Sequence, residues 1–127
     1  MIYVLDTHAI IWFINRDPKL TSAASAVFRD TAARLVVPAI VLAEIFHVQG
    51  RGRVTVTPAA VWAMIDSLSN AVVYPLDELV LERMPAGLEM HDSMIVATAL
   101  VHQATEPVQL VTDDARITAS GLVNVLW

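Results

Sequence analysis

The chain has 127 residues, of which 56% are hydrophobic, and a net charge of −5 from 13 acidic residues against 8 Lys plus Arg. This length fits one domain, residues 1–127, with a core of its own. The acidic balance argues against a general nucleic-acid coat protein but allows a local basic patch. The chain has no cysteine, which excludes disulfides and thiolate metal sites and fits a reducing compartment.

Strand-like and helix-like segments alternate along the chain. Caps, proline positions and apolar patterns predict the elements. In chain order these are a strand 2–5, a helix 7–14, a helix from Thr21 or Ser22 to about Ala33, a strand 35–37, a helix from Pro38 to about Gln49 closed by Gly50, a helix from Thr57 to about Asn70, a strand 71–74, a helix 76–84, a helix 92–103, and strands 108–111 and 123–126.

This alternation predicts an α/β fold with a central, mainly parallel sheet of four to five strands between helices. The strands are continuous apolar runs, which is typical of strands covered on both faces. The longest uncharged apolar runs, such as residues 35–43, fall far short of the ~20 residues of a membrane span. The first apolar run has no basic lead and is interrupted by Asp6. We therefore expect no secretory signal, no membrane partner and a cytoplasmic protein.

Acidic side chains follow two of the predicted strands. Asp6 ends the first strand, and Asp113 and Asp114 lie just past the strand 108–111. In parallel sheets ligands bind beyond the carboxyl ends of the strands, so these acids should meet at one edge. Each acid also has an ordinary explanation, because Asp6 and Asp92 precede helices and could cap them, and Asp113 and Asp114 could belong to a turn.

Glu44 is harder to explain as a structural residue. It lies well inside a predicted helix, and its neighbours at three and four positions are apolar or histidine, with no Lys or Arg among them. Such a carboxylate must reach solvent, become protonated or find a cation elsewhere. A solvated stripe shared with His47 is the alternative, but the flanking residues are too apolar for an exposed face, which favours a site.

Several carboxylates at one edge would repel one another and raise each other's pKa. A hard divalent cation with oxygen ligands removes that conflict. Because the only lysine is Lys19, we expect that no protein cation is readily available to do so. Mg²⁺ or Mn²⁺ is therefore the expected cofactor. Such ions suit phosphodiester hydrolysis, because they lower the pKa of a bound water and shield the phosphate.

Four segments in this order resemble the PIN domain and, more narrowly, the VapC toxins of prokaryotic type II toxin–antitoxin pairs. They are residues 4–8, 38–44, 91–99 and 110–115. The resemblance covers nearly the whole chain and implies a three-layer α/β/α PIN-like fold. It also implies a metal-dependent endoribonuclease that acts as a toxin, with RNA as substrate, a VapB-like antitoxin as partner and a homodimeric state.

The acidic quartet of that family would fall on Asp6, Glu44, Asp92 and Asp114, as catalytic residues and metal ligands. Asp114 is preferred to Asp113 because the usual form is Thr, any residue, then the acid, and Thr112 places that acid at 114. In many relatives the residue after the third acid is Arg. Here it is Ser93, which leaves the acids less neutralised and more dependent on a metal.

Further residues are candidates for supporting roles. Candidates to orient a ligand or water are Thr7, Thr112, Asp113 and His91. Arg51 and Arg53, in a small basic loop after the Glu44 helix, could hold RNA phosphates, although a solvated turn explains them as well.

Other functions fit the residues less well. A haloacid-dehalogenase-type phosphatase needs a second Asp two residues after the first, where this chain has His8, and a phospho-receiver domain needs a Lys beyond a late strand. The stronger alternative is a non-catalytic PIN-like interaction module that binds a protein partner. The complete acid set favours the nuclease.

Overall fold

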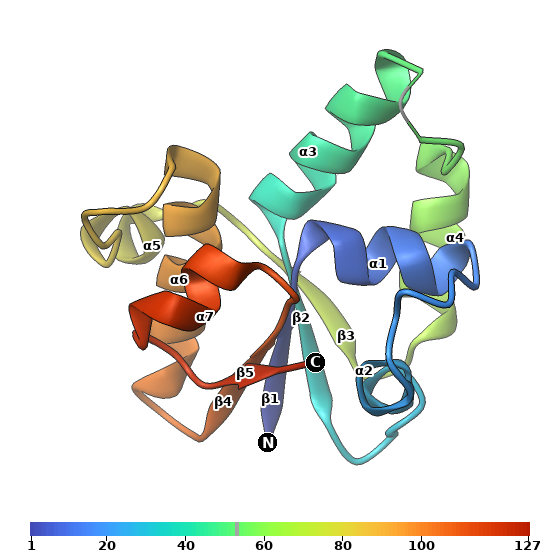
Figure 1. Cartoon of the computed structure of the whole chain (residues 1–127). Coiled ribbons are helices and arrows are strands. Elements are labelled where there is room, and N and C mark those ends of the chain that lie inside the picture. Colours follow the sequence, from blue (N-terminus) through green and yellow to red (C-terminus); the bar gives the residue numbers. More distant parts are fainter. Residues whose placement is uncertain (53) are drawn as a thin grey trace.

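The computed structural model describes residues 1–52 and 54–127, and its centre is a five-stranded sheet (Figure 1). The strands are β1 (Ile2–Leu5), β2 (Arg34–Pro38), β3 (Ala71–Tyr74), β4 (Val108–Val111) and β5 (Val125–Leu126). Their order is β3-β2-β1-β4-β5, and every neighbouring pair is parallel. The predicted α/β fold with a parallel sheet is confirmed.

Seven helices occur in the described part of the chain. They are α1 (Thr7–Ile14), α2 (Ser22–Val27), α3 (Ala39–Gly50), α4 (Pro58–Ser67), α5 (Glu78–Glu82), α6 (Met90–Gln103) and α7 (Ala115–Ser120). In Figure 1, α5, α6 and α7 lie on one side of the sheet and α1, α2 and α4 on the other, while α3 extends from the end of β2. None of these helices is long and apolar enough to cross a membrane.

The core forms where the apolar strands meet the helices. Val4 of the central strand β1 is aligned with Val36 of β2 and with Leu110 of β4, and all three are fully buried. Because all strands are parallel, β1, β2 and β4 end at the same edge of the sheet, where the chain continues toward α1, α3 and α7. This edge carries the acidic residues that follow β1 and β4.

The outer strand β3 contradicts the expectation that every strand is covered on both faces. Val72 and Val73 are 45% and 38% exposed. The reason is its place at the edge of the sheet, next to β2 alone. An apolar sequence alone does not distinguish an edge strand from a central one.

Two predicted helices end earlier than expected. The helix capped by Thr21 ends at Val27, not near Ala33, and the Asp30 side chain accepts a hydrogen bond from the Ala32 N–H at 3.0 Å, which favours a turn. The helix that begins after the Thr57 cap ends at Ser67 rather than Asn70. The Asn70 side chain instead donates to the carbonyls of Asp30 and Ala33.

Other boundaries also differ from the predictions. Pro38 is the last residue of β2 with extended backbone angles, not part of the first helical turn. Gly50 is the last residue of α3, and the positive φ of 70° falls on Gly52. The predicted helix 76–84 is confined to residues 78–82 after the Asp77 cap, and the last strand is confined to residues 125–126.

Candidate active site

Asp6 stands at the carboxyl end of the central strand and is only 6% exposed. It caps α1, because its Oδ1 accepts a hydrogen bond from the Ala9 N–H at 3.2 Å. Its Oδ2 accepts a hydrogen bond from the Thr112 hydroxyl, which comes from the end of β4. Burial raises the pKa of Asp6, although the Thr112 and Ala9 hydrogen bonds oppose that increase. The capping role suggested by the sequence is therefore real, but it engages only one of the two oxygens.

Glu44 points from α3 toward the same edge. The Thr7 hydroxyl, adjacent to Asp6 in the chain, donates to Glu44 Oε1 at 3.2 Å. His91 Nδ1 lies 3.8 Å from Glu44 Oε2, and the Glu44 side chain is 25% exposed. Burial raises the pKa of Glu44; His91 and the Thr7 hydrogen bond lower it, whereas Asp92 and Asp6 raise it further. Glu44 is thus neither a freely solvated residue nor a partner of His47.

Asp92 lies in the first turn of α6 and does not cap it. The helix begins at Met90, so the prediction of a start at Asp92 is wrong by two residues, and Glu89 occupies the cap position. Burial raises the pKa of Asp92, and the charges of Asp114 and Glu89 raise it further, whereas Arg116 lowers it. Asp92 is therefore close enough to both Glu44 and Asp114 for their charges to interact.

The two acids after β4 have different neighbours. Asp114 caps α7 through its Oδ1, which accepts hydrogen bonds from the Arg116 and Ile117 N–H groups at 2.8 and 3.0 Å. Its backbone N–H donates to the Thr112 hydroxyl oxygen at 3.1 Å. Asp113 is exposed and close enough to Asp6 to raise the pKa of that carboxyl. The sequence preference for Asp114 over Asp113 stays a prediction.

These contacts connect four segments that are far apart in the chain. Thr112 joins β4 to Asp6, Thr7 joins α1 to Glu44, and His91 joins the start of α6 to Glu44. Within the described ranges, no three Asp, Glu or His side chains are close enough to hold one ion together. The donor chemistry nevertheless fits a hard cation, because all four acids offer carboxylate oxygens and three have a raised pKa.

Two residues near this cluster were not predicted from the sequence. Arg116 is close enough to lower the pKa of Asp92, and it also pairs with Glu89 at 2.9 Å. The expectation that no protein cation is at hand is therefore wrong at this end of the cluster, and the position of Arg116, two residues after Asp114, was the available signal. His8 lowers the pKa of Asp6, and its ring stacks on Trp12 with centroids 5.1 Å apart.

The structure describes one of the two arginines that are proposed to bind RNA. Arg51 is exposed and follows the last residue of α3, whereas Arg53 falls outside the described residues. Neither assignment is tested by the fold.

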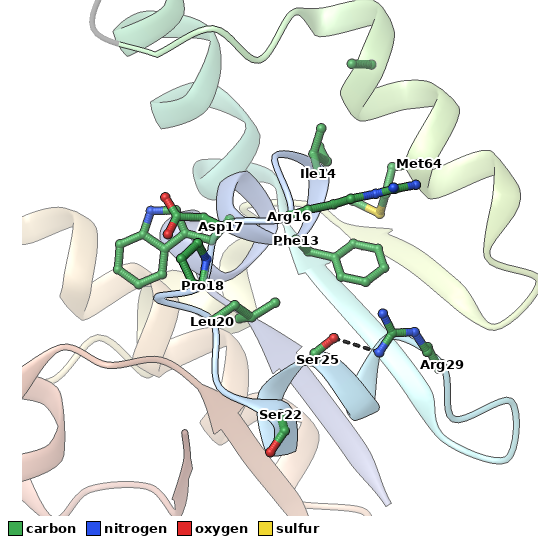
Figure 2. A pocket seen from close by; sticks show the side chains of 12 residues that line it. Phe13, Ile14, Arg16, Asp17, Pro18, Leu20, Ser22, Ser25, Arg29 and Met64 are labelled. Atoms are coloured by element: carbon green, nitrogen blue, oxygen red, sulfur yellow. Dashed lines mark hydrogen bonds between the residues drawn. The ribbon is translucent and has the colours of Figure 1, made fainter.

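Two hollows open on the surface. The smaller, of about 480 Å³, lies beside Glu44 and His91. The larger, of about 800 Å³, lies at the end of α1, and none of the four acids lines it. In Figure 2 the Phe13 ring of the larger hollow is seen between the side chains of Arg16 and Arg29, and Arg29 donates to Ser25. Of these two hollows, the smaller is the one lined by a proposed site acid, Glu44.

Thr112 offers a test of how Asp6 is held. Thr112→Val keeps the shape of this fully buried side chain but removes the hydroxyl that donates to Asp6 and accepts from the Asp114 N–H. If these acids hold a divalent cation, its affinity should fall about 10–100-fold, the usual effect of removing a group that orients a ligand. Metal titration measures this, with the exposed Thr105→Val as the control. Unchanged values in a folded Thr112→Val protein would contradict it.

Comparison with known protein families identifies one match. The family model for the PIN domain matches residues 3–120. No curated protein matches significantly.

Solved structures resemble the whole chain. VapBC2 from Rickettsia felis, bound to a DNA fragment from its promoter, matches with a TM-score of 0.65 and 17% identity over 99% of this chain and 98% of that chain. VapBC-1 from nontypeable Haemophilus influenzae matches with a TM-score of 0.62 and 19% identity over 99% and 97%. FitAcB from Neisseria gonorrhoeae matches with a TM-score of 0.59 and 20% identity over 100% and 97%. The TM-scores establish a common fold despite these low identities, and the family match is decisive: the chain belongs to the PIN-domain family.

Proposed function

We propose that this protein is a metal-dependent endoribonuclease that hydrolyses RNA phosphodiester bonds as the toxin of a type II toxin–antitoxin pair. The observation that carries the proposal is the meeting of acids from distant segments at the carboxyl edge of the sheet, where Thr112 contacts Asp6 and both Thr7 and His91 contact Glu44. Partly buried acids whose pKa values are raised by burial and by neighbouring charges, as for Asp6, Glu44 and Asp92, are typical of functional sites. Membership of the PIN-domain family supports the same reading.

The four acids would hold Mg²⁺ or Mn²⁺. When bound, such an ion lowers the pKa of an attacking water and shields the charge on the phosphate. The chain itself supplies the positioning: Thr112 and the Ala9 N–H orient the Asp6 carboxylate, and Thr7 orients Glu44. Without a cation these acids would repel the RNA backbone, so substrate binding should require the metal.

A VapB-like antitoxin is the proposed partner. Two of the similar structures are VapBC assemblies, one of them bound to promoter DNA. Likeness at this level of identity supports the partner class by analogy of fold. The proposed RNA substrate places the action in the cytoplasm.

A homodimer is part of the same proposal. Exposed apolar side chains gather on the edge strand β3 and in the segment through α5, which is apolar surface of the kind that marks protein contacts. They are Val72, Val73, Leu76, Leu79 and Leu81. Sedimentation of the purified chain at several concentrations tests it, and a strictly monomeric protein would contradict it.

The central experiment is cleavage of RNA by the purified chain. We expect cleavage with Mg²⁺ or Mn²⁺, none after chelation with EDTA, and none by Glu44→Gln, which keeps the size of the side chain and removes its charge. Circular dichroism of the variant confirms that it is folded. A folded wild type that binds Mn²⁺ or an antitoxin but cleaves no RNA would instead favour the non-catalytic interaction module.

A further inference from the structure

The hollow beside Glu44 has one wall from α3 and one from the start of α6. Its lining consists of Ile40, Ala43, Glu44, His47, Val48 and His91. The five α3 residues are spaced by three and four positions, so they share one face of the helix. His91 closes the hollow on the other side, with Nδ1 3.8 Å from Glu44 Oε2. One of the proposed catalytic carboxylates, that of Glu44, therefore forms part of the lining of the hollow.

The chemistry of this lining suits a neutral, planar group better than a phosphate. Ile40, Ala43 and Val48 offer apolar contact, and the imidazoles of His47 and His91 are exposed. Imidazole rings can stack on a nucleobase and exchange hydrogen bonds with its edge. The only acid in the lining is Glu44, which would repel a phosphate unless a cation lay between them.

A cationic side chain follows the α3 residues that line the hollow. Arg51 is exposed and follows Glu44 by seven residues, which is about 10 Å along the helix axis at the usual rise. Along α3, apolar residues lie both before and after the Glu44 carboxylate, an imidazole follows it, and the Arg51 guanidinium comes last. The lining thus offers apolar and imidazole contacts for a base beside Glu44, and Arg51 offers a cation for a phosphate of the same strand.

We propose that this hollow holds an unpaired nucleobase of the RNA, next to the phosphate that is cut. The inference rests on the proposed function and adds to it the residues that receive a base, which must leave its stack to enter such a site. A protein partner suits the hollow less well, since six residues are a small part of the ~20–30 that each side of a stable interface contributes.

Filling the hollow tests the proposal. Ala43 is exposed on α3, so Ala43→Leu adds bulk without disturbing the core. The matched control is Ala63→Leu, also an exposed helical position but on α4. The probe is a single-stranded oligoribonucleotide with a mapped cut site, together with copies that lack the base on one or the other side of that site.

For the wild type, removing one of the two bases should lower kcat/KM about tenfold or more, as expected for loss of base stacking. Ala43→Leu should lower kcat/KM on the intact RNA by a similar factor, mainly through KM, with little further loss on the abasic copy. Ala63→Leu should discriminate between the two substrates as the wild type does.

Each other result overturns the inference in a recognisable way. If Ala43→Leu cuts intact RNA as fast as the wild type, the hollow holds no base. If it loses the same factor on intact and abasic RNA, the substitution has disturbed the carboxylates instead. If sedimentation shows that it changes the oligomeric state, this face belongs to a protein contact. A wild type that cuts no RNA at all overturns the proposed nuclease and, with it, the base site.

Discussion

Replacing Asp6 by Asn is expected to lower metal-dependent RNA cleavage by about 10²–10³-fold, the range seen when one preorganised electrostatic group is removed from an active site. Asp6 is the most buried of the four acids, at 6% exposed, and it directly follows the central strand. Asparagine keeps an oxygen for the Ala9 N–H, and its amide can donate to the Thr112 hydroxyl oxygen. The loss should therefore reflect charge and metal binding rather than a collapsed helix start.

A matched control separates capping from chemistry. Asp77 caps α5 in the same way, by accepting from the Val80 N–H at 3.0 Å, but it is not one of the four acids. Asp77→Asn should cleave RNA at the wild-type rate, and both variants should unfold cooperatively. Full cleavage by a folded Asp6→Asn protein would remove Asp6 from the catalytic centre.

The metal-free protein should become less stable as the pH rises through the pKa values of its clustered acids. Asp6, Glu44 and Asp92 have folded-state pKa values above their ordinary values of 3.8, 4.5 and 3.8, mainly because of burial. Between the ordinary and the raised pKa the folded state binds more protons than the unfolded state. The free energy of unfolding therefore falls with increasing pH in that window and stays lower above it.

A divalent cation should reverse this loss. It binds the ionised carboxylates, so its effect should be larger at pH 8 than at pH 5. At a hundredfold excess over Kd the stabilisation is about 2.7 kcal/mol. For a domain of this size, each kcal/mol of stabilisation raises Tm by about 4 °C.

Thermal unfolding at both pH values, with EDTA or with Mn²⁺, measures the effect. Glu44→Gln removes one of the coupled charges, so its metal-free Tm should decline less with pH and respond less to Mn²⁺. The difference between the two proteins isolates the cluster from other titrating groups. If the metal-free Tm of wild type and of Glu44→Gln changed equally with pH, the burial and charge of Glu44 would not contribute to the pH dependence, which would contradict the prediction.

Sequence reasoning succeeded where interactions are local. The caps at Thr21 and Thr57 and the apolar run of β4 follow from residues within three or four positions of one another. It failed at Asp92 because Asp can stand either at a cap or in the first turn of a helix, and α6 begins two residues earlier. It also misjudged residues 28–33, where the Asp30 side chain favours a turn over a helix of otherwise suitable composition.

The sequence by itself determined the fold class, the acids that end β1 and follow β4, and the unusual position of Glu44 in an apolar helix. Only the tertiary structure decided the strand order, the exposed edge strand, and the partners of each carboxylate. Thr7 meets Glu44 across 37 positions in sequence, and Thr112 meets Asp6 across 106. Local patterns cannot specify such contacts, because they arise from the parallel pairing of β1 with β2 and β4, which brings distant strand ends to one edge.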